Sequence, residues 1–375
     1  MQELPATPAT PSDEPSETMR ESQPFMLVQM AMAKAEALTR CERWGAALDA
    51  YAEAIRLAGD DGLGLATKTD AHRGAAIVRM RCSNWDEAES DLLKSQKLAS
   101  KLRDDRRLAL VKNVRAAVAF ERGNWSDAQQ LYQAARQHAE ASGSTQLLAQ
   151  IDNNEGALWS ALGRQKQAEA CFRRALEMFE ELDNHPCGAR TLNNLGVALV
   201  AQGQLWEADN VYDRAMCKCK RQGDRTLAAE VMLNRADLAY IRGNDHQAES
   251  LADRARTFAE HLENVVLQAS ALRILGGVAR LAGDLALAKQ RIETALELSQ
   301  GATAPLSEAE AWAELGLLFM DRNDTEQAEK AWRRAQSIYR DLGNTIEADR
   351  LDQQIDSSKR LDQQIDSSKR QSEAA

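Results

Sequence analysis

An alanine returns about every 40 residues along most of this chain, and it constrains the fold more than any other feature. The eight members of the series are Ala47, Ala88, Ala128, Ala168, Ala208, Ala248, Ala288 and Ala328. Twelve residues before each stands a second small residue, in order Ala35, Ala76, Ala116, Gly156, Gly196, Ala236, Gly276 and Gly316. Small residues that return at one phase mark places where backbones approach too closely for larger side chains.

The spacing inside each unit indicates a pair of helices. Ala168, Phe172 and Ala175 stand at i, i+4 and i+7, which is one face of a helix. Bulky residues hold the same middle position in other units, at Tyr51, Tyr132, Tyr212 and Trp332. The turn between the two helices carries a glycine, which can take the left-handed conformation that ends a helix, at Gly123, Gly163, Gly203, Gly243 and Gly283. Glu42, Ser83 and Asn323 replace it in the other three units. The sequence therefore predicts an all-α fold of about eight stacked helical hairpins.

This pattern resembles the tetratricopeptide repeat, in which a small residue of the first helix is followed by alanine, an aromatic residue and alanine in the second. The resemblance covers residues 25–344 and implies a right-handed α-solenoid. Each unit is about six residues longer than the commonest form of the repeat, so a longer second helix and following turn are expected. The segment Thr191–Gly196, which reads TLNNLG, looks like the repeats of kinesin light chains and of the spindle-orientation adaptors that bind G-protein α subunits.

A solenoid grows by stacking and needs no central core, so residues 25–344 are expected to form one domain. Five of the seven prolines fall within the first 24 positions, among serine, threonine and glutamate. Such a segment buries too little apolar surface to offset the entropy of ordering it. Residues 1–24 are therefore expected to be a disordered, acidic, proline-rich tail.

The carboxyl end carries an exact duplication, because the decapeptide LDQQIDSSKR fills 351–360 and again 361–370. We expect residues 345–360 to form a capping helix, with Ile346 and Leu351 covering the exposed face of the eighth unit. Ten residues advance a helix by about 1000°, so the second copy's apolar stripe is turned roughly 80° from the first. Residues 361–375 are accordingly expected to be a frayed, functionally neutral duplication. The alternative is that they form a short partner-binding motif.

Nothing in the sequence indicates an enzyme. The five histidines are scattered, and no glycine-rich phosphate loop is present. The nearest thing to a metal cluster is His185, Cys187, Cys217 and Cys219. Cys217 and Cys219 stand two apart on a helix and face different directions, which favours packing thiols over a zinc site. We predict no catalytic residues, no cofactor and no metal.

Charge and hydropathy exclude two further classes of partner. The net charge is −10 and the pI is near 5.2, whereas phosphate binding calls for a basic face. No run of about 18 apolar residues occurs, so no membrane span is expected. The first residues lack the apolar core of an export signal, and the six cysteines lack the framework of a secreted domain. The sequence predicts a cytoplasmic protein, with association with the cytoskeleton and the oligomeric state left open.

The resemblance also implies where a partner binds. In such solenoids the first helices line a concave groove, and residues just before each small position face it. On this chain the rule selects Asn113, Asn153, Asn154, Asn193, Asn194 and Asn234, flanked by Arg73, Arg81, Arg190 and Arg273. Asparagine is a poor interior helix former, but its amide can bind the backbone of an extended peptide of any sequence. The resemblance implies this role most directly for Asn193 and Asn194. Otherwise the asparagines solvate the face or satisfy helix ends.

The groove's charge is predicted to be uneven. Arg73, Arg81 and Arg190 lie toward its first half, and acidic residues lie at the far end, at Glu310, Glu314 and Asp321. A partner segment with an acidic portion would match the first half. We therefore predict a non-enzymatic scaffold or adaptor that binds a peptide or helix of another protein.

Two alternatives to this function remain. The first is a structural subunit of a cytoskeletal, ciliary or transport assembly that uses its convex face. The second is a bacterial-type signalling regulator. It is less expected because such regulators carry an additional amino-terminal domain, for which about 24 residues are available here.

Overall fold

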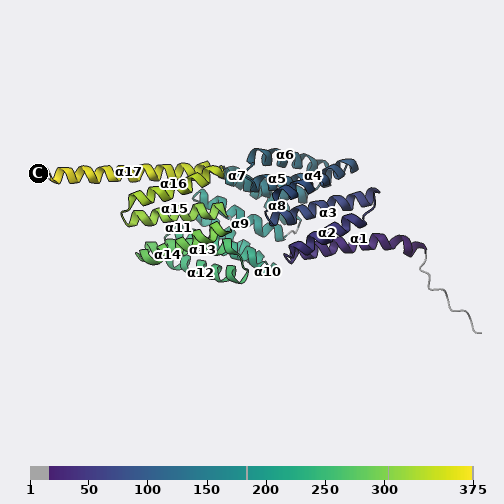
Figure 1. The fold of residues 1–375 in the computed structure, drawn as a ribbon, viewed down its shortest axis with the longest axis horizontal. Coiled ribbons are helices and arrows are strands. Elements are labelled where there is room, and N and C mark those ends of the chain that lie inside the picture. Colours follow the sequence, from purple (N-terminus) through teal and green to yellow (C-terminus); the bar gives the residue numbers. More distant parts are fainter. Residues whose placement is uncertain (1–16, 183–184, 303, 374–375) are drawn as a thin grey trace, which may run out of the picture. The chain divides into compact units, whose positions relative to one another are not determined.

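The computed structural model describes residues 17–182, 185–302 and 304–373, and the side chains in these ranges except at 17–24, 185–186 and 361–373. All regular structure in these ranges is helical (Figure 1). The chain divides into two units, which are described separately. The first takes residues up to Arg122 together with Gln130–Gly143, and the second takes Gly123–Gln129 and the residues from Ser144 onward.

The helices of the first unit begin with α1 (Glu17–Arg40), α2 (Trp44–Leu57), α3 (Gly62–Arg81), α4 (Trp85–Leu102) and α5 (Asp105–Glu121). Helix α6 (Trp125–Ala141) begins in the second unit and ends in the first. The second unit continues with α7 (Thr145–Ala161), α8 (Gln165–Glu181), α9 (His185–Ala201), α10 (Leu205–Gln222), α11 (Arg225–Ile241) and α12 (Asp245–His261). It ends with α13 (Val265–Leu281), α14 (Leu285–Gly301), α15 (Pro305–Asp321), α16 (Thr325–Asp341) and α17 (Thr345–Glu373).

Odd- and even-numbered helices play different parts in the second unit. The pairs α7–α8, α9–α10, α11–α12, α13–α14 and α15–α16 form hairpins, and each second helix also packs on the next first helix. The first helices contact one another in the series α7, α9, α11, α13 and α15, whereas the described residues of the second helices make no such series. The first helices therefore lie on the inner side of the curve that this unit follows.

The small residues of the repeat face the bulky residue of the same hairpin. A Cβ atom added to Gly196 would lie 2.3 Å from the Tyr212 ring, and one added to Gly316 would lie 2.2 Å from Trp332. Ala208, at the centre of the register, is fully buried. These contacts confirm the predicted pairing of small and bulky positions, which sets how closely the two helices approach.

The turns inside the hairpins use a left-handed residue whether or not it is glycine. The five predicted glycines have φ between +71° and +82°, and Glu42, Ser83 and Asn323 take φ of 56°, 57° and 57°. The prediction of a left-handed turn is confirmed. A side chain with a Cβ in this region costs about 1 kcal/mol or more, so Glu42 and Ser83 hold strained turns.

In the turns between hairpins, a side chain often caps the amino-terminal end of the next helix. Arg103, Gly143, Gly223 and Glu263 also have positive φ. The next residue is often an acid or asparagine that accepts a backbone N–H three residues on, at 2.9 Å for Asp104, 2.9 Å for Asp224 and 3.1 Å for Asn264. These caps supply partners for N–H groups that the first turn of a helix leaves free, and they stand where the common repeat often has a proline.

Both ends of the array differ from the expected boundaries. Helix α1 begins at Glu17, inside the segment expected to be a tail, while residues 1–16 lie outside the described residues. Helix α17 covers α16 through Leu351 and Ile355, which are 3% and 5% exposed. Ile346 was expected to do the same but is 50% exposed, and Ala348, three residues before Leu351, is the buried residue instead. The backbone stays helical to Glu373, beyond the expected end at 360.

Candidate functional site

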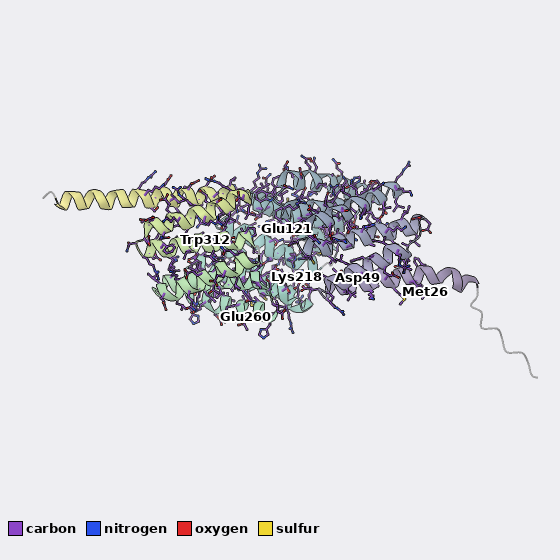
Figure 2. The ribbon with its side chains drawn as sticks, viewed as in Figure 1. Met26, Asp49, Glu121, Lys218, Glu260 and Trp312 are labelled. Carbon is purple, nitrogen blue, oxygen red and sulfur yellow. The ribbon has the colours of Figure 1, made fainter. Side chains whose placement is uncertain are left out.

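The predicted site residues fall on both units, all of them on first helices. Arg73, Arg81 and Asn113 belong to α3 and α5 of the first unit. The others belong to α7, α9, α11 and α13 of the second unit: Asn153, Asn154, Arg190, Asn193, Asn194, Asn234 and Arg273. We call the surface formed by these residues of the second unit the first-helix face. Figure 2 draws the described side chains on the ribbon and labels Trp312 of α15.

The asparagines of the first-helix face bond to one another between neighbouring repeats. Asn194 Nδ2 donates to Asn153 Oδ1 at 3.3 Å, and Asn234 Nδ2 donates to Asn193 Oδ1 at 2.8 Å. Each bond joins residues 41 positions apart on adjacent first helices. Asn193 is only 6% exposed. The asparagine row thus holds first helices together, in addition to any role toward a partner.

Two amide oxygens remain available on this face. Within the described part of the chain, Oδ1 of Asn194 and Oδ1 of Asn234 accept no hydrogen bond, and both side chains are half-buried. Exposed apolar residues accompany them, since Val197 is 41% exposed, Ile241 52% and Leu281 49%. The first-helix face therefore offers hydrogen-bond acceptors beside apolar contacts.

Arginine and acidic side chains form a second set of links between first helices. Arg190 pairs with Glu230 at 3.3 Å, and Arg273 reaches both Asp237 at 2.9 Å and Glu310 at 3.3 Å. Burial works to lower the pKa of Arg273, but the charges of Asp237 and Glu310 outweigh it and raise that pKa. Burial also raises the pKa of Glu310, and Arg273 opposes this.

A cluster of polar side chains links the first helices of the last repeats. The Tyr240 hydroxyl on α11 donates to Glu314 on α15 at 2.9 Å, and Arg280 on α13 bonds to Glu314 at 3.0 Å. Arg280 also reaches Asp321 at 2.7 Å. Burial, and next the Glu314 charge, raise the pKa of Tyr240. Because the cluster spans three first helices, it fixes their register as well as their contact.

Many of the charged residues that were expected to make the groove uneven are paired with groups of opposite charge. Glu310 lies beside Arg273, and both Glu314 and Asp321 lie beside Arg280, so two arginines offset part of the charge of the three carboxylates. Arg190 is likewise paired with Glu230. In the first unit Arg73 lies 3.9 Å from Asp70, and Arg81 is exposed. The uneven charge stays a prediction. It was counted along single helices, whereas neighbours in the next repeat offset part of each charge.

Side chains that lie close enough to share a metal ion contact an arginine instead. Asp152, Glu155 and Cys171 bring ligand atoms within 4.8 Å of one another, but Arg174 donates to the Asp152 carboxylate at 2.6 Å and lies against the Cys171 sulfur at 3.3 Å. Its guanidinium supplies the positive charge there. On α10, Cys217 is exposed and Cys219 is buried, and burial raises the pKa of Cys219 to about 11. The side chain of His185 lies outside the described residues.

Two stretches of the chain match the tetratricopeptide-repeat family, at residues 147–216 and 309–342. The chain is built from tetratricopeptide repeats. Such repeats generally serve as protein-interaction modules and usually lack catalytic groups. A comparison with curated proteins finds no match. The described helices contain no segment with the length and hydrophobicity that crossing a bilayer requires.

Several solved tetratricopeptide-repeat structures are similar to this chain over most of its length. A Rap protein complexed with competence and sporulation factor is 12% identical, with a TM-score of 0.62, covering 89% of this chain and 98% of its own. The Rap conjugation gene regulator of plasmid pLS20, complexed with a Phr peptide, is 13% identical, with a TM-score of 0.54 and coverage of 91% and 97%. Aspartyl phosphate phosphatase F of Bacillus subtilis is 11% identical, with a TM-score of 0.53 and coverage of 88% and 94%.

At these identities the similarity shows the fold alone. It nevertheless bears on one argument from the sequence. Bacterial regulators were set aside because they carry an additional amino-terminal domain, yet this chain spans nearly all of the three similar chains. Length therefore does not separate this chain from them.

Proposed function

We propose that this protein is a non-enzymatic interaction scaffold whose first-helix face binds an extended segment of a partner protein. The observation that carries the proposal is the pair of unfilled acceptors, Oδ1 of Asn194 and Oδ1 of Asn234, on adjacent helices beside exposed apolar side chains. A half-buried acceptor is completed by a backbone N–H group, which every residue except proline supplies.

The spacing of the two acceptors fits a particular backbone conformation. Packed helices lie about 8–10 Å apart, and we take a step of about this size between the equivalent positions Asn194 and Asn234. A polyproline II segment has three residues per turn and rises about 3.1 Å per residue, so it presents an N–H to the same side every 9 Å or so. A peptide running across the helices in this conformation would meet both acceptors with residues i and i+3.

The remaining properties of the face define the chemistry of the segment. Because the arginines and carboxylates are paired with one another, the second unit favours a segment with apolar side chains over a strongly charged one. Val197, Ile241 and Leu281 supply the matching apolar contacts. Two of the similar structures are complexes, one with competence and sporulation factor and one with a Phr peptide, which agrees with this use of the fold. No disulfide joins cysteines in the part of the chain that the structure describes, in keeping with a cytoplasmic site of action.

The test is selection of a displayed random-peptide library on the full chain, followed by calorimetry with the selected peptide. Asn194→Ala combined with Asn234→Ala should weaken binding by roughly 5- to 150-fold, from about 1–3 kcal/mol for two hydrogen bonds. Asn153→Ala is the matched control, because it removes the interhelical bond of Asn194 but leaves the acceptor. Equal losses for both variants would assign the effect to helix packing, and unchanged binding would contradict the proposal.

A further inference from the structure

The amino-terminal hairpin has a side that no described helix covers. Among the described residues, α3 is the helix that packs on both α1 and α2. On α1, Leu27 is 48% exposed and Met30 is 63% exposed, and Lys34 is exposed as well. These residues stand at i, i+3 and i+7, so they share one side of the helix.

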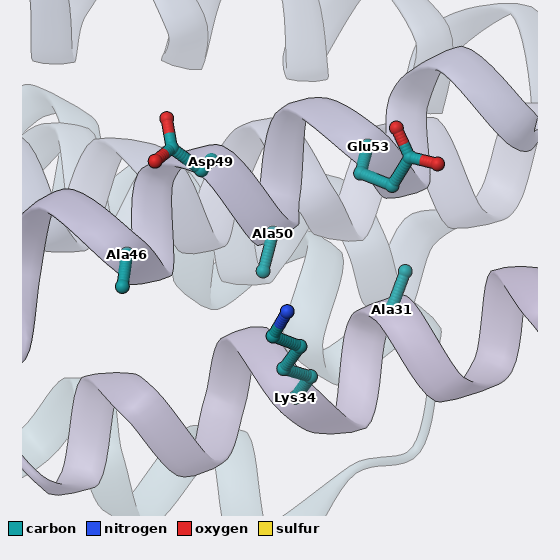
Figure 3. Close-up of a pocket in the computed structure, with 6 residues that line it drawn as sticks. All are labelled: Ala31, Lys34, Ala46, Asp49, Ala50 and Glu53. Atoms are coloured by element: carbon teal, nitrogen blue, oxygen red, sulfur yellow. The ribbon is translucent and has the colours of Figure 1, made fainter.

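A matching stripe runs along α2. Its residues stand at i, i+3, i+4 and i+7 and are Ala46, Asp49, Ala50 and Glu53. Together with Ala31 and Lys34 they line an open hollow of about 190 Å³ (Figure 3). Figure 3 shows Lys34 extending from α1 toward α2, with the carboxylates of Asp49 and Glu53 directed away from it. We call these two stripes, including Leu27 and Met30, the amino-terminal face.

The amino-terminal face has both protruding apolar side chains and a hollow in which such side chains would fit. Leu27 and Met30 stand out from α1, while the alanines of the two stripes leave the hollow open. In a two-fold symmetric contact, each patch meets itself, and residue i touching residue j implies j touching i. A two-fold axis between α1 and α2 would set α1 of each copy on α2 of the other. The flexible Met30 side chains would then enter the opposite hollows.

The charges of the amino-terminal face also suit a contact in which α1 of each copy lies on α2 of the other. Lys34 makes no ion pair with any residue that the structure describes, and Glu53 pairs with Arg56 on its own helix at 2.5 Å. In the symmetric contact, the Lys34 ammonium of each copy faces the α2 stripe of the other, where Asp49 and Glu53 stand. A partner carrying one sign of charge would oppose either the lysine or the two carboxylates.

We propose that the amino-terminal face binds the same face of a second copy of this chain, giving a two-fold dimer. The residues with described side chains number 16 on α1, at 25–40, and 14 on α2, so their shared face measures roughly 450 Å² at about 1.5 Å per residue and 10 Å of width. Standard interfaces bury about 800 Å² per partner, which places this one at the small end. The dimer is therefore expected to be weak. It leaves the first-helix face unused.

Sedimentation of the full chain over a range of concentrations measures this dimer. We expect a monomer–dimer equilibrium in the wild type. Met30→Glu should weaken it by roughly a hundredfold, because each interface would bury two unpaired carboxylates. Leu93→Glu is the matched control, since Leu93 is a 50% exposed leucine on α4 of the same unit, and it should leave the equilibrium unchanged.

A charge exchange identifies the surface directly. Lys34→Glu should dissociate the dimer, and so should Asp49→Lys combined with Glu53→Lys, because each makes the face uniform in sign. Mixed together, these two variants should form a heterodimer, since each supplies the charge that the other lacks. A wild type that stays monomeric overturns the proposal. So does a dimer that Met30→Glu leaves intact, or a mixture of the two charge variants that stays monomeric.

Discussion

Hairpin α15–α16 at the carboxyl end is covered by α17, whereas hairpin α1–α2 at the amino end presents Leu27 and Met30 to solvent. Leu351 of the covering helix is 3% exposed, and Met30 at the other end is 63% exposed. A stack of hairpins always leaves two unfilled ends, because each repeat buries its apolar face only against a neighbour. Among the described residues, a helix of this chain covers the carboxyl end of the array but not the α1–α2 face, and the proposed dimer would cover that face instead.

Helix α17 caps the array by packing on α16 in the same way that each first helix from α9 to α15 packs on the second helix before it. Leu351 and Ile355 join the core of α15–α16 beside Trp332 and Tyr339. Arg340 of α16 pairs with Asp352 at 2.8 Å, and Lys359 pairs with Glu329 at 3.2 Å. Since α16 begins at Thr325, the pair with Glu329 shows that the first decapeptide reaches the amino-terminal end of α16. The second decapeptide continues the helix beyond it.

The largest predicted effect compares the two identical decapeptides. Leu351→Ala with Ile355→Ala should destabilise the last hairpin by about 4 kcal/mol or more, because each buried side chain costs about 2 kcal/mol or more when cut to alanine. The same pair of changes in the second copy, Leu361→Ala with Ile365→Ala, should change stability by less than about 0.5 kcal/mol. Hydrogen exchange of α16 reports both. Equal effects in the two copies would show that the cap extends past Arg360.

An intermediate effect compares the turns. Glu42→Gly and Ser83→Gly should each stabilise by roughly 0.5–1 kcal/mol, because glycine takes a positive φ without strain. Gly203→Ala should destabilise by about 1 kcal/mol, since Gly203 has a φ of +73°. Nothing lies within 4 Å of the site of its added Cβ, so crowding does not contribute. Urea unfolding measures all three, and a stabilising Gly203→Ala would refute the assignment.

The smallest effect concerns the uncovered end itself. Leu27→Ala with Met30→Ala should lower the stability of the dilute monomer by less than about 0.5 kcal/mol, because both side chains already meet water. At high protein concentration the same variant should melt below the wild type, since only the wild type gains from association. Melting temperatures that do not depend on concentration in either protein would remove the contrast between the two ends.

The fold followed from the sequence because its strongest signal is steric. The return of small residues such as Gly196 and Ala208, with Tyr212 between the helices, predicts the hairpins and their pairing, and the contacts confirm both. The caps between hairpins went unpredicted, although Asp104, Asp224 and Asn264 stand at the same position of the 40-residue repeat, 120 and 40 residues apart, and carry a readable signal. A search for cap residues in the repeat register would have found them.

The candidate site was harder to predict. The sequence gives the phase of Asn194 and Asn234 on their helices, but not which groups bond across repeats. Whether Asn193 meets a peptide or the amide of Asn234 depends on the rotation and separation of neighbouring helices. The pairing of Arg280 with Glu314 likewise depends on two helices that lie 34 residues apart in sequence. Such contacts are set by tertiary packing, so patterns within single helices do not reveal them.

The central claim, that the first-helix face binds an extended backbone, is tested most directly by a crystal structure of the chain with its selected peptide. We expect Oδ1 of Asn194 and Oδ1 of Asn234 to accept hydrogen bonds from peptide N–H groups three residues apart, at about 2.7–3.2 Å. The peptide should lie across α9 and α11. A peptide seated on the second helices, or on the α1–α2 hairpin with both oxygens left to water, would contradict the account.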